Sequence, residues 1–210
     1  MSSMVNVIHN KTVLVATQND NKKKEIMDIL KNIPGILLRG PEYFPFLPDV
    51  EEKGNTFQEN AIQKATILAK ACNTWAMADD SGLEIDALDG RPGVYSCRYA
   101  GTNATDEQNI QKVLSELRWV PKEKRTARFV CAIALASPDQ VFFVVEGRCE
   151  GSIAEEPRGK CGFGYDPIFY VSQYHQTFAE LSSAIKNKIS HRADALRQFK
   201  EKIIPLIKGI

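Results

Sequence analysis

The sequence contains no Cys-x-x-Cys pair, only three histidines and almost no net charge. Its five cysteines are scattered and odd in number, which favours reduced thiols over a disulfide framework. The histidines are His9, His175 and His191, and their spacing matches no zinc site. Lysine and arginine number 27 against 26 aspartates and glutamates, so a broad basic surface for nucleic acid is not expected. We therefore expect neither a zinc site nor a nucleic-acid partner.

Long apolar runs are also missing from the sequence. No stretch approaches the roughly 20 apolar residues that a membrane-spanning helix needs. The first residues lack a basic segment followed by an apolar one, which is the pattern of a secretory signal. We expect no membrane partner and a cytoplasmic location.

The chain is long enough, at 210 residues with 43% hydrophobic side chains, to bury a substantial core in a single domain, 1–210. Apolar runs alternate with helical spacing in its first half, and two later apolar runs predict an antiparallel hairpin. The fold class is therefore expected to be α/β with a mixed sheet. Strands are predicted at 12–16, 36–39, 75–78, 128–135 and 141–147, and helices at 23–30, 56–73, 105–117 and from 190.

Two adjacent carboxylates, Asp79 and Asp80, follow the apolar run 75–78 and precede Ser81-Gly82. This order predicts a buried strand that ends in a tight polar turn. Side chains alternate between the two faces of a strand, so one aspartate is suited to hold a cation while the other orients water or substrate. The alternative is a purely local turn, in which the aspartate and serine side chains bond nearby backbone groups.

The polar segment 17–22 separates the first predicted strand from the first helix. Such a position cradles phosphate with backbone N–H groups and the positive end of the helix dipole. Thr17 and Asn19 supply hydrogen-bond donors and Lys22 a charge. The segment has no glycines and is not a Walker A loop. The alternative is that its lysines form a solvated face.

An acidic segment, 49–55, leads into Thr56-x-x-Glu59, the pattern of a capping box that starts a helix. Glu51 or Glu52 comes near the strand end at Asp79 if the helix crosses over to that strand. The alternative is an ordinary solvated loop.

Two further candidates lie in the second half of the chain. Residues 163–167, Phe-Gly-Tyr-Asp-Pro, offer an aromatic stacking face beside a carboxylate, although a structural turn explains them equally well. Ser190 is a predicted N-cap of the closing helix. It places His191 and Arg192 in the first turn, where cations oppose the helix dipole unless an anion offsets them, and this favours a functional role.

These segments occur in one order along nearly the whole chain. That order closely resembles the inosine/xanthosine triphosphate pyrophosphatase family, the house-cleaning nucleotidases of the Ham1 type. The motifs are Thr17-x-Asn19-x-x-Lys22-x-x-Glu25, Gly54-x-Thr56-Phe57-x-Glu59-Asn60-Ala61, Asp79-Asp80-Ser81-Gly82-Leu83, Pro92-Gly93-x-Tyr95-Ser96-x-Arg98-Tyr99, Phe163-Gly164-Tyr165-Asp166-Pro167 and Ser190-His191-Arg192.

The resemblance implies a homodimeric α/β protein with an elongated mixed sheet flanked by helices, and two lobes around a central nucleotide-binding cleft. It implies hydrolysis of noncanonical purine nucleoside triphosphates (ITP, dITP and XTP) to the monophosphate and pyrophosphate with Mg²⁺. Glu51 and Asp80 match the acidic metal positions, with Asp80 also the proposed base, and Glu52 is the neighbouring alternative to Glu51. The implied substrate contacts are Thr17, Gln18, Asn19, Asp20, Asn21, Lys22 and Lys64 on the phosphate side, and Ser81, Phe163, Gly164, Tyr165, Asp166, Lys186, His191 and Arg192, the latter group around the purine.

Two other classes of function remain open from the sequence. One is a noncatalytic nucleotide-sensing or RNA-binding module, and the other is a pyrophosphatase for canonical or modified pyrimidine nucleotides. RNA binding requires a continuous basic stripe, whereas the near-neutral total and interleaved acids favour a small, metal-bound anion.

Overall fold

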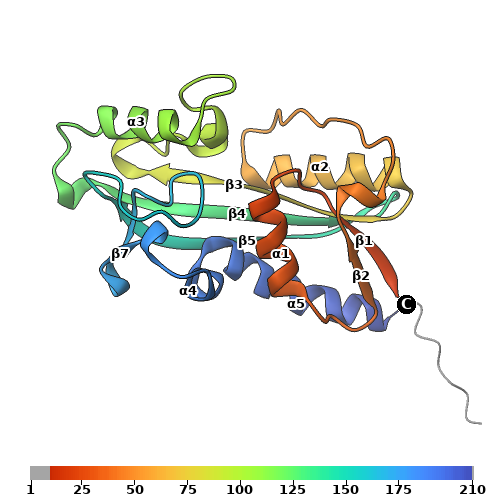
Figure 1. Cartoon of the computed structure of the whole chain (residues 1–210). Coiled ribbons are helices and arrows are strands. Elements are labelled where there is room, and N and C mark those ends of the chain that lie inside the picture. Colours follow the sequence, from red (N-terminus) through yellow and green to blue (C-terminus); the bar gives the residue numbers. More distant parts are fainter. Residues whose placement is uncertain (1–9, 210) are drawn as a thin grey trace, which may run out of the picture.

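A single mixed sheet runs through the length of the molecule (Figure 1), as a computed structural model of the chain shows. The model describes residues 10–209, so His9 and the segment considered for a secretory signal lie outside it. The strands are β1 (Lys11–Val15), β2 (Ile36–Arg39), β3 (Trp75–Ile85), β4 (Thr126–Ala136), β5 (Val141–Ile153), β6 (Phe169–Val171) and β7 (Gln176–Thr177). The helices are α1 (Asp20–Leu30), α2 (Phe57–Cys72), α3 (Asp106–Glu116), α4 (Ser183–Ile189) and α5 (His191–Lys208).

The strand order in the described chain is β2-β1-β3-β4-β5-β6-β7. β1 runs parallel to β2 and β3, whereas the pairs from β3 to β7 are antiparallel. This confirms the α/β class and the mixed sheet. The predicted hairpin is also confirmed, since β4 and β5 pair along almost their whole lengths around the turn at 137–140.

Helices cover both faces of the sheet (Figure 1). α2 packs on β3 and β4 through small alanines, while α5 packs on β4 and β5 from the opposite face together with α1. The contact of α5 with β5 is very close at Gly147, where a Cβ atom would lie 2.3 Å from the backbone nitrogen of Ala195. Glycine at this position lets the start of α5 lie directly on the sheet.

The helix starts predicted at Thr56 and Ser190 are confirmed by their caps. Thr56 accepts a hydrogen bond from the Glu59 N–H, and Ser190 accepts one from the Ala193 N–H, so each satisfies a free donor of the first turn. The capping box predicted for α2 is incomplete, because the Glu59 carboxylate accepts from the Asn55 N–H instead of from Thr56. The N-terminus of α2 is thereby bonded to the acidic segment that precedes it.

The tight turn predicted after Asp79 is wrong. β3 continues without interruption to Ile85, and Asp79 and Asp80 stand opposite Ile133 and Ala132 of β4. The carboxylates do not bend the backbone because their partners come mainly from helices on the two faces of the sheet, and the long apolar strand β4 holds β3 extended. Both aspartates are therefore located in the middle of a long central strand.

None of the helices within residues 10–209 combines the length and the apolar character that a membrane crossing requires.

Candidate active site

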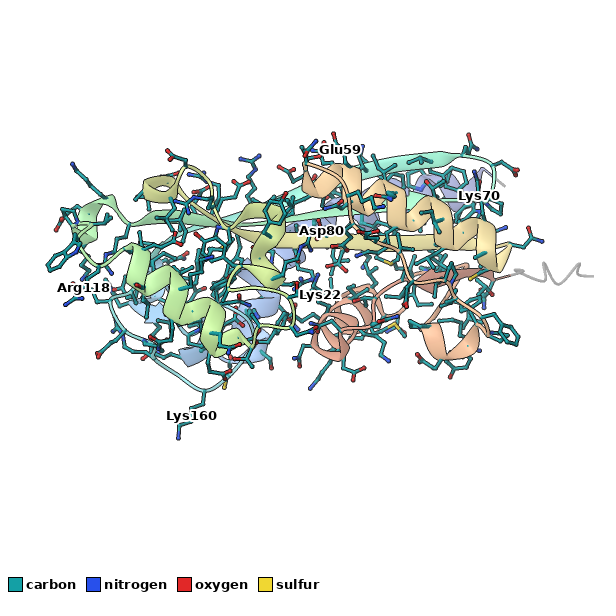
Figure 2. All side chains as sticks on the ribbon, turned by 90° about the horizontal axis from the view of Figure 1, so that it is seen from above. Lys22, Glu59, Lys70, Asp80, Arg118 and Lys160 are labelled. Carbon is teal, nitrogen blue, oxygen red and sulfur yellow. The ribbon has the colours of Figure 1, made fainter. Side chains whose placement is uncertain are left out.

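The alternation of β3 sends its two aspartates to opposite faces of the sheet. Asp79 shares its face with Met77, which belongs to the core under α1 and α5, whereas Asp80 shares its face with Ala78, which belongs to the core under α2. Figure 2 shows Asp80 and Lys22 in the middle of the molecule, between its two ends. The sheet thus separates two environments for chemically identical side chains.

Asp79 is buried on the face of the sheet that α1 and α5 cover. Its Oδ2 atom lies 3.1 Å from Lys22 Nζ and 3.5 Å from Arg192 Nη2. Burial alone would raise the pKa of Asp79, but the charges of Lys22 and Arg192 bring it well below its usual range. Asp79 is therefore held as a carboxylate and fixes two cations beside the cleft.

Asp80 has the opposite electrostatic setting. Its Oδ2 accepts from the Asn60 side chain at 2.8 Å, and its Oδ1 accepts from the Ser81 N–H at 2.8 Å. Burial and the negative charge of Glu52 raise the pKa of Asp80, although the hydrogen bond from Asn60 acts against them. A carboxylate with a raised pKa is suited to accept a proton or to bind a cation.

The acidic segment presents Glu52, not Glu51, to this site. The Glu52 side chain is 23% exposed and forms an ion pair with Lys64 of α2. Glu51 is 78% exposed and pairs with the neighbouring Lys53 at 2.9 Å. Lys64 also donates to the Asp79 carbonyl oxygen at 3.1 Å, so it lies between the acidic segment and β3.

The segment 17–22 includes the start of α1. Asn19 is the N-cap, and its side chain accepts a hydrogen bond from the Lys22 N–H. The helix begins at Asp20, so the predicted polar loop is shorter than expected and the helix longer. Lys22 lies in the first turn, where burial acts to lower its pKa, but the charge of Asp79 acts the other way, and the pKa is raised.

Two hollows meet at Asn19, Lys22 and Cys97 and together form a cleft. Most of the predicted substrate contacts line it. The hollow beside the acidic segment includes Thr17, Gln18, Glu52 and Lys64, and the other hollow includes Asn21, Ser81, Phe163, Gly164, Tyr165, Asp166, Lys186, His191 and Arg192.

Three predicted residues do not line either hollow. Asp20 is exposed and pairs with Lys23, and Glu51 points to Lys53. Asp80 is 6% exposed and lies behind the surface of the cleft, near Glu52 and Lys64. The structure therefore brings together the remaining predicted contacts, with Asp80 beneath them.

Cations and aromatic rings line the second hollow. Lys186 forms an ion pair with Asp166 at 2.5 Å and lies 4.6 Å from the centre of the Phe163 ring. Burial raises the pKa of Asp166, although Lys186 acts against it. Glu25 of α1 accepts from both Lys186 and Arg192. Asp166, the carboxylate predicted beside an aromatic ring, is thus already paired with Lys186.

The first turn of α5 contains a neutral histidine beside a charged arginine. Burial and the nearby charges of Arg192, Lys186 and Lys22 hold the pKa of His191 well below its ordinary value. The anions Glu25 and Asp79 offset the charge of Arg192. Within the described chain, His191 Nδ1 and Arg192 Nε are buried without a hydrogen-bond partner, and both residues line the second hollow.

The predicted site omitted several lining residues, such as Ser96, Asp106 and Asn109, and also Glu25 and Asn60, which bond the charged groups of the site. Glu25 was part of a motif, but nothing in the sequence indicated that it bonds Lys186 and Arg192 from another helix. Asn60 lies in the first turn of α2 and bonds Asp80. The available signal for Asn60 was its place in the motif of residues 54–61, and the structure shows that it is buried.

The donors near Asp80 have the chemistry that magnesium prefers. Asp80 and Glu52 supply carboxylate oxygens, which are hard ligands, and a bound cation would offset the repulsion between their like charges. Among residues 10–209, no group of three or more acidic, cysteine or histidine side chains is already gathered at metal-binding distance. The two carboxylates fit a metal that is bound jointly by protein and phosphate.

The chain is an α/β protein whose mixed sheet carries two adjacent aspartates on its long strand β3, next to a cleft lined by buried lysine and arginine side chains. A family model described as the Ham1 family matches residues 13–202. The chain belongs to the Ham1 family.

Curated relatives are similar over most of their length. A dITP/XTP pyrophosphatase of Bacillus subtilis (strain 168) is 55% identical over 188 residues, which cover 90% of this chain and 94% of the relative. A dITP/XTP pyrophosphatase of Geobacter sulfurreducens is 52% identical over 189 residues, with 90% and 94% covered. The solved structure of a HAM1 protein from Coxiella burnetii has a TM-score of 0.85 and 46% identity, and the match covers 93% of this chain and 99% of that one.

The buried neutral histidine predicts a pH dependence of stability. The folded-state pKa of His191 lies well below 6.5, so the unfolded chain gains a proton that the folded chain does not as the pH falls through 6.5. His191 therefore lowers the free energy of unfolding by up to about 1.4 kcal/mol per pH unit below pH 6.5. Urea unfolding between pH 7.5 and 5.5 measures this slope.

His191→Gln should reduce the slope. His175→Gln, at an exposed position, is the matched control for the change from histidine to glutamine. An unchanged slope in His191→Gln would show that His191 does not titrate as its burial requires.

Proposed function

We propose that the protein hydrolyses noncanonical purine nucleoside triphosphates, namely ITP, dITP and XTP, to the monophosphate and pyrophosphate. The observation that carries this proposal is the cleft, which Lys22 and Lys64 line and beneath which the carboxylate of Asp80 is buried with a raised pKa. The names of the relatives, dITP/XTP pyrophosphatase, support the same activity.

In this proposal the triphosphate occupies the hollow beside the acidic segment. Lys22 and the N-terminus of α1 bind its anionic oxygens, and Lys64 adds a second charge. The cations offset the charge of the triphosphate and of the departing pyrophosphate. Asp80 orients the attacking water and accepts its proton on the carboxylate.

Glu52 and Asp80 are the residues we propose to hold Mg²⁺. When bound, Mg²⁺ supplies positive charge against the phosphate oxygens. Glu52 is preferred to Glu51 because its side chain faces Lys64 and Asp80, whereas Glu51 pairs with Lys53.

The purine is proposed to lie in the second hollow, beside Phe163. Inosine and xanthosine carry a keto oxygen at position 6, which accepts hydrogen bonds from donors such as the unpartnered Arg192 Nε. Adenine presents an amino donor there, which leaves the buried donor unpaired at a cost of about 1–3 kcal/mol. This mismatch gives a physical basis for rejecting ATP.

We also propose that the chain forms a homodimer, as the resemblance to this family implies, and that it is located in the cytoplasm, which its scattered cysteines support. Sedimentation equilibrium of the purified chain measures the assembly state.

Incubation with ITP and Mg²⁺ tests the activity. We expect equal amounts of IMP and pyrophosphate, slower turnover of ATP and GTP, and loss of turnover when EDTA removes the metal. Chromatography of the nucleotide together with a pyrophosphate assay identifies the products. Formation of IDP and phosphate, or no turnover of ITP, dITP and XTP, would contradict the proposal.

Asp80→Asn should keep nucleotide binding and lose turnover by about 10²–10⁴-fold, because the amide cannot accept the proton of the attacking water. Equilibrium binding of ITP, measured by calorimetry, and kcat separate the two effects. A variant rate near that of the wild type would remove Asp80 from the mechanism.

Glu52→Gln and Glu51→Gln are a matched pair that tests the metal ligand. We expect the Mg²⁺ concentration for half-maximal rate to rise by about 10-fold or more in Glu52→Gln and to change by less than about twofold in Glu51→Gln. The reverse ranking would assign the metal to Glu51.

A further inference from the structure

Asn60 is a buried polar side chain on an apolar helix face. It is 1% exposed, and the rest of the buried face of α2 is made of phenylalanine, alanine and leucine. Asparagine is a weak helix former, and burial of an amide is costly unless its hydrogen bonds are made. A buried asparagine at this position is therefore favourable only if its amide has hydrogen-bond partners.

Both ends of the Asn60 amide are bonded. Its Oδ1 accepts from the Gly54 N–H at 2.7 Å, and its Nδ2 donates to Asp80 Oδ2 at 2.8 Å. A backbone N–H only donates and an ionised carboxylate only accepts, so the two partners fix the orientation of the amide. Asn60 thus connects the acidic segment to β3 through one rigid group.

The carboxylate of Asp80 is fixed by this contact. One of its oxygens accepts from Asn60 and the other from the Ser81 N–H, so each oxygen has one internal donor. The remaining lone pairs are left for water or a cation. Loss of the Asn60 donor would leave the carboxylate free to rotate about its side-chain bonds.

The other end of the amide sets the position of the acidic segment. A Cβ atom on Gly54 would lie 2.7 Å from Asn60 Oδ1 and 2.7 Å from Glu59 Cβ, so the backbone approaches α2 as closely as glycine allows. Glu59 adds a second bond, to the Asn55 N–H. Glu52 stands two residues before Gly54, and these contacts fix where its side chain can reach.

We propose that Asn60 is a positioning residue that sets the separation and orientation of the Asp80 and Glu52 carboxylates. The two carboxylates repel each other; Lys64 pairs with Glu52, while Asn60 bonds Asp80 directly and the backbone of the acidic segment at Gly54. Asn60 touches neither hollow of the cleft, so it acts through Asp80 and Gly54 and not on the nucleotide. This inference rests on the proposed pyrophosphatase function.

Asn60→Ala and Gly54→Ala test the two ends of the connection. We expect each to lower kcat for ITP by about 10- to 100-fold and to weaken Mg²⁺ binding, measured by calorimetry without nucleotide, by about 10-fold, with KM changed by less than about threefold. Gln58→Ala, in the same helical turn but bonded to Glu146, is the matched control and should behave as wild type.

The thermal midpoint of each variant shows whether it is folded, and Gly54→Ala decides the question if Asn60→Ala fails to fold. Folded variants that keep both kcat and Mg²⁺ affinity within about twofold of the wild type would overturn the proposal. A wild-type chain that releases no pyrophosphate would instead contradict the proposed function, and the Mg²⁺ affinities would still decide the role of Asn60.

Discussion

The arrangement of helices around the cleft depends on the ion pairs of Asp79. One buried carboxylate on β3 bonds Lys22 at the start of α1 and Arg192 at the start of α5. Removing charges from water is unfavourable, and a buried group of this kind is stable only when every member is paired. Glu25 extends the network from Arg192 to Lys186. Helices distant in sequence are thereby fixed around one hollow.

The neighbouring aspartate has a different task because its surroundings differ. Asp79 faces two cations, which lower its pKa, whereas burial and the negative charge of Glu52 raise the pKa of Asp80. Two identical side chains whose pKa values are moved apart are a recurring sign of divided roles in catalysis. In this protein Asp79 fixes Lys22 and Arg192 beside the cleft, and Asp80 is the carboxylate for which we propose the proton and metal chemistry.

Local patterns predicted the elements well, and three-dimensional contacts explain the failures. The caps at Thr56 and Ser190 depend on adjacent residues and were predictable. The turn after Asp79 was wrong because distant partners satisfy its carboxylates. The roles of Glu25 and Asn60 depend on contacts with other elements, so spacing along the chain could not assign them. The family resemblance predicted about half of the residues that line the cleft.

The register of the uninterrupted strand β3 against β4 decides to which face of the sheet each aspartate side chain projects. Asp79 is opposite Ile133, and Asp80 is opposite Ala132. A slip of one residue against β4 would exchange the faces of the sheet to which the two side chains project. The acid that pairs with Lys22 and Arg192 and the acid proposed to serve the reaction are therefore distinguished by strand register and not by residue type. The pairing of β3 with β4 therefore determines which aspartate meets Lys22 and which one meets Asn60.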